Sequence, residues 1–360
     1  MVHTQSGTGE PALAVDGPTA PAWLSDPIPA ASSAPTPWRH VAGATAALVL
    51  LLATMLTAFV WPAVNGGPRD VPLGVAAPAD AAAGIEAALA AAEPGAFEVT
   101  RYADGDAARE AVAHREVDGA VVIGPDGATM LTAPAGSAAV ATALGQVADA
   151  LGARQAEAQG LDVPRLVQVE PVVPLPADDP RGAGLTSAAL PLVLASVAAG
   201  VVAALAVRGM GRRLVLVGSV AAVGGLVAAG LAGPWLGVLT GGLWGQAGVL
   251  ALGVAAIALA VVGGHALLGR PGLALAVAVM MLLGNPLSAA ASAPELLPAG
   301  WAELGQALPP GAVVNALRSV AYFDGWGASA PVLVLAGWVA AGLLLVGLAQ
   351  GWRRLTAPGA

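Results

Sequence analysis

The sequence of 360 residues is 57% hydrophobic and only 11% charged, with a formal net charge of -8 at pH 7. Soluble domains carry about 25% charged residues, so this composition predicts an integral membrane protein. The chain has no cysteine, which excludes disulfides and thiolate chemistry, and all 15 basic residues are arginine. Without lysine the chain cannot form the lysine-dependent phosphate loop of an ATPase.

The first 37 residues are rich in Pro, Ala, Ser, Thr and Gly and show no apolar periodicity. We therefore predict a disordered cytoplasmic tail at residues 1–37. The apolar segment that follows begins too late and is too long for a signal peptide. It predicts a first transmembrane helix over residues 38–64, with Trp38 and Trp61 at its ends, where tryptophan rings favour the membrane–water interface.

Residues 65–184 differ from the rest of the chain because they hold 17 of the 23 acidic residues. Their apolar patterns predict the order β-α-β-α-β-β-α-β, which is typical of a small α/β domain with its own core. Asp104 or Asp106 is expected to cap the second helix, and Ser137 the third. The expected strands are Val71–Ala76, Phe97–Tyr102, Ala120–Ile123, Thr129–Ala133 and Val163–Val173, and the expected helices are Ala79–Ala92, 104–117 and 137–159.

Five more apolar segments predict a five-helix transmembrane domain over residues 185–354, followed by a cytoplasmic tail at 355–360. The stretch Leu214–Gly269 has no charged residue, and a spanning helix needs about 20 apolar residues. The spans are expected at Gly182–Val207, Leu214–Ala232, Ala247–Leu268, Pro271–Pro294 and Pro331–Gly351. The predicted fold is an α-helical polytopic membrane protein with six transmembrane helices and an extracytoplasmic α/β domain inserted after the first.

The arginines indicate how these spans are oriented. Alternate connections carry no acid, and their arginines are Arg39, Arg208, Arg212, Arg213, Arg270, Arg353 and Arg354. The positive-inside rule places these connections in the cytoplasm. Both termini are then cytoplasmic and the acidic domain lies outside. Because the Ala, Gly, Arg and Pro bias is typical of a GC-rich bacterial genome, we predict a multi-pass protein of the bacterial plasma membrane.

The connection before the last span is expected to be structured. Two short amphipathic helices are predicted at Trp301–Leu308 and Val313–Tyr322, separated by Pro309-Pro310. We expect them, within an outer region of about 295–330, to lie on the outer leaflet or to re-enter it.

Two polar features inside the predicted spans each have two interpretations. His265 could belong to a proton relay, but a helix-packing or interfacial histidine is favoured because no span holds an acid. Asn285 and Pro286 could break the fifth span where it lines a pathway. The favoured alternative is that this span ends near Gly284 and that the outer connection begins there.

The remaining candidates for chemistry have simpler explanations. Glycines recur every four residues from Gly233 to Gly245, which fits either close helix packing or a tight outer turn. The acidic pairs are better explained by turns and helix caps than by metal binding, and they are Asp104/Asp106, Glu116/Asp118 and Asp178/Asp179. We predict no catalytic, cofactor-binding or metal site, no cofactor in this chain and no nucleic-acid partner.

Two patches, together with the order of spans, carry a family resemblance. The first is Asp106-Ala-Ala-Arg109-Glu110-Ala-Val112 followed by Val117-Asp118-Gly119-Ala120-Val121-Val122-Ile123. The second comprises Asn285-Pro286-Leu287-Ser288, Pro294-Glu295-Leu296-Leu297-Pro298, Leu308-Pro309-Pro310-Gly311 and Asn315-Ala316-Leu317-Arg318. Over residues 40–354 the chain resembles the type-2 ABC exporter permeases, and most closely their YhgE/Pip-like branch.

The resemblance implies a permease subunit that acts as a homodimer or in a pair within the lipid bilayer. A separate cytoplasmic ABC ATPase would supply the energy to export hydrophobic or amphipathic cargo. Asn285, Pro286 and Arg318 would belong to the pathway or re-entrant region, and Arg208, Arg212 and Arg213 would contact the ATPase. The connection at 208–213 is short for the coupling helix that such permeases use. The alternative is a non-transporting membrane protein whose outer domain binds partners or supports cell-envelope assembly.

Overall fold

The computed structural model describes residues 37–125, 127–159 and 167–356. The chain divides into two units, Met1–Leu52 and Ala53–Ala360, and every contact discussed below lies within the second. The predicted N-terminal tail falls outside the described residues except for Pro37, and so do residues 357–360 of the predicted C-terminal tail.

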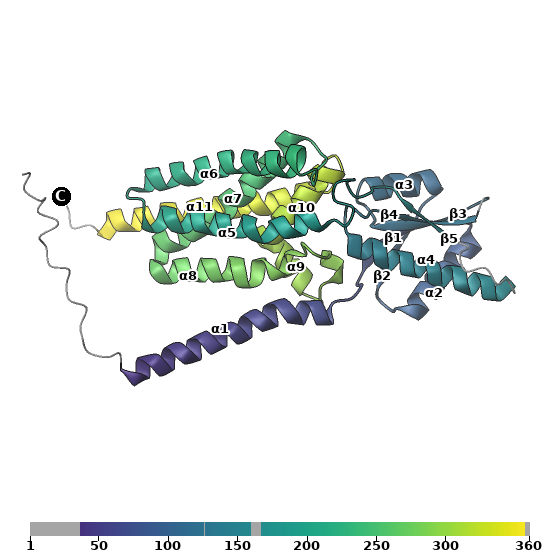
Figure 1. Cartoon of the computed structure of the whole chain (residues 1–360), viewed down its shortest axis with the longest axis horizontal. Coiled ribbons are helices and arrows are strands. Elements are labelled where there is room, and N and C mark those ends of the chain that lie inside the picture. Colours follow the sequence, from purple (N-terminus) through teal and green to yellow (C-terminus); the bar gives the residue numbers. More distant parts are fainter. Residues whose placement is uncertain (1–36, 126, 160–166, 357–360) are drawn as a thin grey trace, which may run out of the picture. The chain divides into compact units, whose positions relative to one another are not determined.

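Among the described residues, five helices are long and apolar enough to cross a membrane, as the composition predicts for a polytopic membrane protein (Figure 1). They lie close to the predicted spans but extend beyond several of them into flanking residues. The five are α1 (Trp38–Asn65), α5 (Ala183–Leu205), α6 (Met210–Gly230), α7 (Leu243–Leu268) and α11 (Ser329–Thr356).

The fifth predicted span is shorter than we expected. Helix α8 (Arg270–Ala278) continues as a π-helical turn to Gly284, so the apolar helix covers Arg270–Gly284 rather than 271–294. A short 3-10 turn, Pro286–Ser288, then leads to Ala289, whose φ of 54° is left-handed. Proline has no N–H to continue the ladder, and the left-handed residue reverses the chain. The interpretation that the span ends near Gly284 therefore describes the helix correctly.

Helix α7 is the centre of the helical domain. It contacts α5, α6, α10 (Pro309–Tyr322) and α11, and most of its side chains are buried. Glycines allow the close approach at two of these contacts: a Cβ on Gly225 would lie 2.7 Å from the Ala247 carbonyl oxygen, and one on Gly342 would lie 2.7 Å from the Leu259 Cβ. Small residues are the usual means of bringing membrane helices together.

The two helices of the outer connection are α9 (Trp301–Ala307) and α10. We expected amphipathic helices with one face left for the leaflet. Instead α10 is buried along most of its length, because α7 and α11 pack against it. A 14-residue helix that is buried on nearly every side, its polar residues included, is a core element rather than one with an exposed polar face.

The acidic segment folds into a five-stranded sheet with the predicted order of strands and helices. The strands lie in the order β2-β1-β3-β4-β5, with β3 and β4 antiparallel and the other pairs parallel. They are β1 (Val71–Ala76), β2 (Phe97–Arg101), β3 (Gly119–Gly124), β4 (Gly127–Thr132) and β5 (Val167–Pro171). The first part of the predicted last strand, 163–166, lies outside the described residues.

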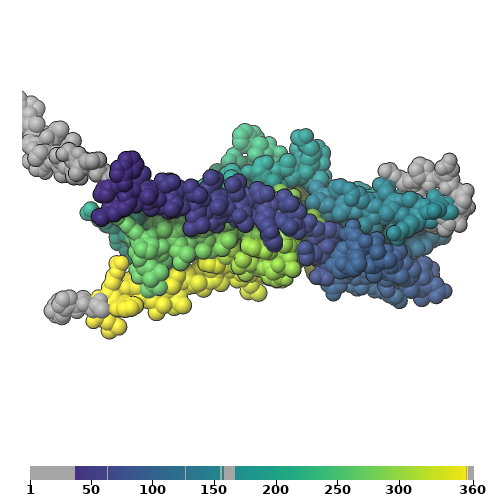
Figure 2. All heavy atoms as spheres, turned by 90° about the horizontal axis from the view of Figure 1, so that it is seen from below, coloured from purple at the N-terminus to yellow at the C-terminus, as the bar shows by residue number. Residues whose placement is uncertain are grey.

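Helices cover both faces of this sheet (Figure 1). Leu89 of α2 (Ala79–Ala92) and Leu144 of α4 (Ala138–Gln159) share one core with Leu73 and Met130 of the strands. Val112 of α3 (Gly105–Ala113) belongs to a second core on the other face. The atoms of this domain pack as one body, with α4 forming part of its surface (Figure 2).

Two predicted helix caps are present, which explains why α3 and α4 begin where they do. The Asp104 carboxylate accepts a hydrogen bond from the Ala107 N–H at 2.8 Å, and the Ser137 hydroxyl accepts one from the Val140 N–H at 3.2 Å. Helix α3 ends at Ala113, four residues before the predicted end, and Arg115 follows with a left-handed φ of 59°. This reversal directs the chain into β3.

Candidate functional site

The chain between α8 and α9 forms a segment of largely irregular backbone, residues 285–297, here called the outer segment. Its start is fixed by Gly284, because a Cβ there would lie 2.6 Å from the Pro310 ring of α10. Its end is fixed by main-chain bonds from the Gly67 N–H to the Leu296 carbonyl at 3.1 Å and from the Arg69 N–H to the Glu295 carbonyl at 3.0 Å. Non-helical backbone needs such partners wherever it is buried.

Arg318 of α10 holds the middle of the outer segment. Its Nη2 donates to the carbonyl oxygens of Ala289 at 2.9 Å, Ala290 at 2.9 Å and Ser292 at 3.1 Å. The side chain is only 6% exposed. Hydrogen bonds from a guanidinium to carbonyl groups are charge-assisted and stronger than neutral ones. The predicted site residue Arg318 is therefore the support of the segment that follows Asn285 and Pro286.

Two hydroxyls outside the predicted site reinforce this arrangement. The Thr186 hydroxyl of α5 donates to the Ala290 carbonyl at 2.9 Å, and the Ser137 hydroxyl donates to the Ser292 carbonyl at 3.3 Å. Thr186 lies at the start of α5, 104 residues from its partner in sequence, and Ser137 lies at the start of α4, 155 residues from its partner. The sequence offered only a helix cap at Ser137 as a signal, and none at Thr186.

Cavities flank the outer segment on two sides. One of about 570 Å³ is lined by Asn285, Pro286, Thr186, Phe59 and Leu190, among others. The second, of about 260 Å³, is lined by polar side chains from four parts of the chain, which are Ser137, Arg181, Thr186, Ser187, Ser292, Arg318 and Tyr322. The structure thus brings Asn285, Pro286 and Arg318 to one region. Asn285 and Pro286 line the cavity on one side of the outer segment, and Arg318 lines the cavity on the other side.

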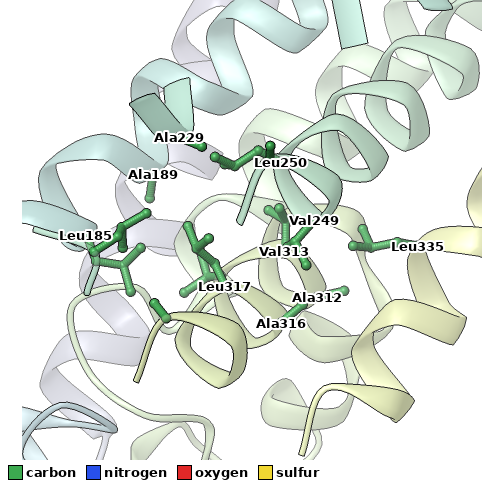
Figure 3. Packing of buried hydrophobic residues seen from close by; sticks show 14 of the residues in the cluster. Leu185, Ala189, Ala229, Val249, Leu250, Ala312, Val313, Ala316, Leu317 and Leu335 are labelled. Atoms are coloured by element: carbon green, nitrogen blue, oxygen red, sulfur yellow. The ribbon is translucent and has the colours of Figure 1, made fainter. Parts of the chain in front are cut away.

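A third cavity, of about 350 Å³, lies among α5, α6, α7 and α10. Ser196 contributes the only polar side chain among its lining residues, and its hydroxyl is already donated to the Leu192 carbonyl at 2.6 Å. Leu185, Leu250, Val313 and Leu317 line this cavity and belong to the buried cluster of the helical domain (Figure 3). The cavity suits an apolar group, because it offers almost nothing for a polar one to bind.

A polar junction joins the α/β domain to α10. Arg115 donates from Nη1 to the Ser319 hydroxyl at 2.6 Å, and its guanidinium lies 5.1 Å from the centre of the Phe323 ring. His114 stacks on Trp326 with ring centres 4.0 Å apart. This junction was not predicted, although Asp118 lies within the first patch of the resemblance and Arg115 between its two parts.

Asp118 is the acid of this junction, and it is not one of the solvated turn residues that we expected. Its Oδ2 is buried and has no hydrogen-bond partner among the described residues. Burial raises the pKa of the Asp118 carboxyl to about 7, and the nearby Glu295 carboxylate adds to the rise, whereas Arg115 and Arg318 oppose it. The other acidic pairs behave as expected where they can be followed: Asp179 caps α5 by accepting from the Ala183 and Gly184 N–H groups at 2.9 and 2.8 Å.

The predicted ATPase contacts lie around the connection between α5 and α6. This connection is only residues 206–209 and contains no helix; Arg208 and Arg212 are exposed. Arg213 is partly buried, and its Nε donates to the Val207 carbonyl at 2.9 Å, which ties the start of α6 to the end of α5. Of the three arginines, Arg208 and Arg212 are thus free to meet a partner.

His265 lies in the last turn of α7, half-buried, with no hydrogen bond to its Nδ1 from the described part of the chain. The charges of Arg213, Arg270 and Arg353 all act on it, so these arginines gather at one end of the helical domain. No group of three or more acidic or histidine side chains suited to a metal ion occurs within residues 37–125, 127–159 and 167–356.

Comparison with protein-family models, with curated proteins and with solved structures finds no significant match to this chain. The fold itself defines the class: a mainly helical protein with five candidate membrane helices and a small sheet domain, as expected of a polytopic membrane protein. The resemblance to exporter permeases remains a prediction.

Proposed function

We propose that this chain is the permease subunit of an ABC-type exporter, which moves hydrophobic or amphipathic cargo outward with energy from a separate cytoplasmic ATPase. The observation that carries the proposal is the apolar cavity of about 350 Å³ among α5, α6, α7 and α10. Helices α5 and α6 both pack extensively on α7 but much less on each other, so the cavity lies where two helices separate. A static anchor needs no such cavity.

We further propose six crossings of a bacterial plasma membrane, with both termini cytoplasmic and the α/β domain outside. The short helix at Arg270–Gly284 would be the additional crossing. Arg270 lies at the arginine-rich end with Arg213 and Arg353, whereas the outer segment that follows Gly284 is bonded to the α/β domain through Ser137. A 15-residue helix is about 22 Å long, so the bilayer would thin locally or the turn at 286–288 would complete the crossing.

In this proposal the chain works as a homodimer or in a pair with a related permease, and Arg208 and Arg212 face the ATPase. The Asn285–Ser292 backbone, held by Arg318, forms the outer end of the pathway. One observation favours the alternative, a non-transporting membrane protein whose outer domain binds partners or supports cell-envelope assembly: the connection at 206–209 has no coupling helix for an ATPase to engage.

The proposal is tested by trapping the partner and by blocking the cavity. A photo-cross-linker at Gly211, which is exposed and has nothing within 4 Å of its Cβ position, should capture an ATP-hydrolysing subunit in native membranes. The Ala228→Phe variant, which fills the apolar cavity, should bind that subunit but lose cargo export by roughly tenfold or more.

Val227→Phe is the matched control, because Val227 is the neighbouring residue on α6, is 53% exposed and does not line the cavity. It should retain wild-type export. Capture of only copies of the chain or of envelope proteins would favour the alternative function. Equal loss in both phenylalanine variants would contradict the role of the cavity.

A further inference from the structure

The strongest unexplained feature of the molecule is the charge of Arg318. The side chain is 6% exposed, yet no carboxylate lies within ion-pair distance of it in the part of the chain that the structure describes. Asp118 and Glu295 act on it only from a distance, together with the opposing charge of Arg115. A buried cation without a direct counter-ion is costly, and buried charges in proteins are normally paired.

The free donors of Arg318 belong to a cavity. All three of its hydrogen bonds use Nη2, and no acceptor for Nε or Nη1 lies among the described residues. Arg318 lines the cavity of about 260 Å³ between the outer segment and the start of α5, and Arg181 lines the same cavity. Nε and Nη1 lie on opposite sides of the guanidinium, so either one can donate a single charge-assisted hydrogen bond to a phosphate or carboxylate.

Three of the five hydroxyls that line this cavity are already used, and those of Ser187 and Ser292 make no hydrogen bond within the described residues. The hydroxyls of Ser137, Thr186 and Tyr322 donate to the carbonyls of Ser292, Ala290 and Val238. Asp179, the acid nearest to the start of α5, is satisfied by two main-chain N–H groups of that helix. No acidic side chain of the described residues lines the cavity, so its two arginines favour a negatively charged ligand over a neutral polar one.

The charged cavity adjoins the apolar one. Leu185 lines both cavities, and on each of two helices a residue of the apolar cavity is followed directly by a residue of the charged one. On α5, Leu185 is followed by Thr186, and on α10, Leu317 of the apolar cavity is followed by Arg318 of the charged one. Leu185 and Leu317 belong to the same buried cluster (Figure 3). The two cavities together offer a cationic pocket beside an apolar pocket.

We infer that these cavities form one binding site for an anionic amphiphile, with its phosphate or carboxylate on Arg318 and Arg181 and its apolar chain beside Leu185 and Leu317. This deepens the proposed function by naming the chemical class of the cargo, and in that respect it rests on it. Binding itself needs no ATPase, so the site can be tested separately from transport.

The test uses the full chain in a neutral detergent, titrated with phosphatidylglycerol and with phosphatidylcholine of the same acyl chains. Phosphatidylglycerol should bind saturably at one molecule per chain and at least about tenfold more tightly, since one charge-assisted contact contributes on the order of 1.5–3 kcal/mol. Inorganic phosphate at millimolar concentration should compete only weakly, because it lacks the apolar chain.

Three variants complete the test. Arg318→Gln should abolish the preference for the anionic lipid. Arg181→Gln should weaken phosphatidylglycerol binding by roughly threefold to tenfold, and since Arg181 is exposed and makes no bond within the described residues, this variant should fold normally. Arg208→Gln is the matched control, since it removes an exposed arginine that lines none of these cavities, and it should bind like the wild type.

Equal affinity for the two lipids, or equal effects of Arg181→Gln and Arg208→Gln, would overturn the inference. Displacement of the lipid by inorganic phosphate alone would show a site for a small anion and would also overturn it. Lipid binding without any ATPase partner would leave this site standing and contradict only the proposed transport.

Discussion

Replacement of Gly225 by leucine is expected to remove most of the folded protein, because this glycine sets the contact between α6 and α7. Even a Cβ would lie 2.7 Å from the Ala247 carbonyl oxygen and from the Ala251 nitrogen, which are main-chain atoms that cannot move aside. Overpacking a core commonly costs about 1–3 kcal/mol. Here the whole side chain meets backbone, so we expect a loss above about 4 kcal/mol.

Gly218 provides the matched control on the same helix. It is exposed and nothing lies within 4 Å of its Cβ position, so Gly218→Leu should be neutral or slightly stabilising through helix propensity. The measurement is the monodisperse fraction and the thermal midpoint of each purified variant in detergent. If Gly225→Leu matched Gly218→Leu, the close packing of α6 on α7 would be wrong.

The junction around Asp118 is expected to weaken as pH rises. Its carboxyl has a pKa of about 7 in the folded chain against 3.8 as the ordinary value, so the folded state holds a proton between these values that the unfolded state releases. The stability contributed by this proton is therefore complete below about pH 4 and is lost as pH rises through 7. Above pH 7 a charged carboxylate stands beside Glu295, with Arg115 and Arg318 in partial compensation.

We expect the thermal midpoint of the wild type to fall by roughly 4–6 °C between pH 5 and pH 8, since the raised pKa of Asp118 is worth on the order of 2–3 kcal/mol over this range and 1 kcal/mol moves the midpoint of a chain this size by about 2 °C. Asp118→Asn should flatten this dependence. His114→Gln is the control, because it removes the ring that stacks on Trp326 in the same junction and leaves Asp118 in place, so it should keep the slope. A slope that stays unchanged in Asp118→Asn would contradict the role of this carboxyl.

The sequence predicted the elements well where local patterns decide them. The strands and helices of the acidic segment follow from alternation, turn residues and caps, and Asp104 and Ser137 make the cap hydrogen bonds that their positions indicated. Charge-free stretches likewise predicted the long helices. The prediction extended the short helix at Arg270–Gly284 too far. Apolar residues continue past the turn at Pro286, and hydropathy alone does not show where the backbone reverses.

The candidate site was only partly predictable, because its contacts join residues far apart in sequence. Asn285, Pro286 and Arg318 were singled out, but nothing local shows that Arg318 binds the carbonyls of 289–292 or that Thr186 assists from α5. The polar junction of Arg115 with Ser319 joins residues 204 positions apart. In the sequence only the spacing of Arg115 and Asp118, three positions apart, pointed to it. The burial of α10 was missed because its polar residues pair inside the domain, as Asn315 does with Gln306 at 3.1 Å.

Site-specific labelling tests the central claim most directly, namely that arginine-bearing connections and the acidic domain lie on opposite sides of a membrane. The chain contains no cysteine, so one introduced residue reports alone. Glu98→Cys on β2 and Gly211→Cys near the α5–α6 connection both replace exposed residues. A maleimide that cannot cross membranes should label Glu98→Cys in intact cells and Gly211→Cys only after permeabilisation. Labelling of both cysteines from the same side would contradict the account.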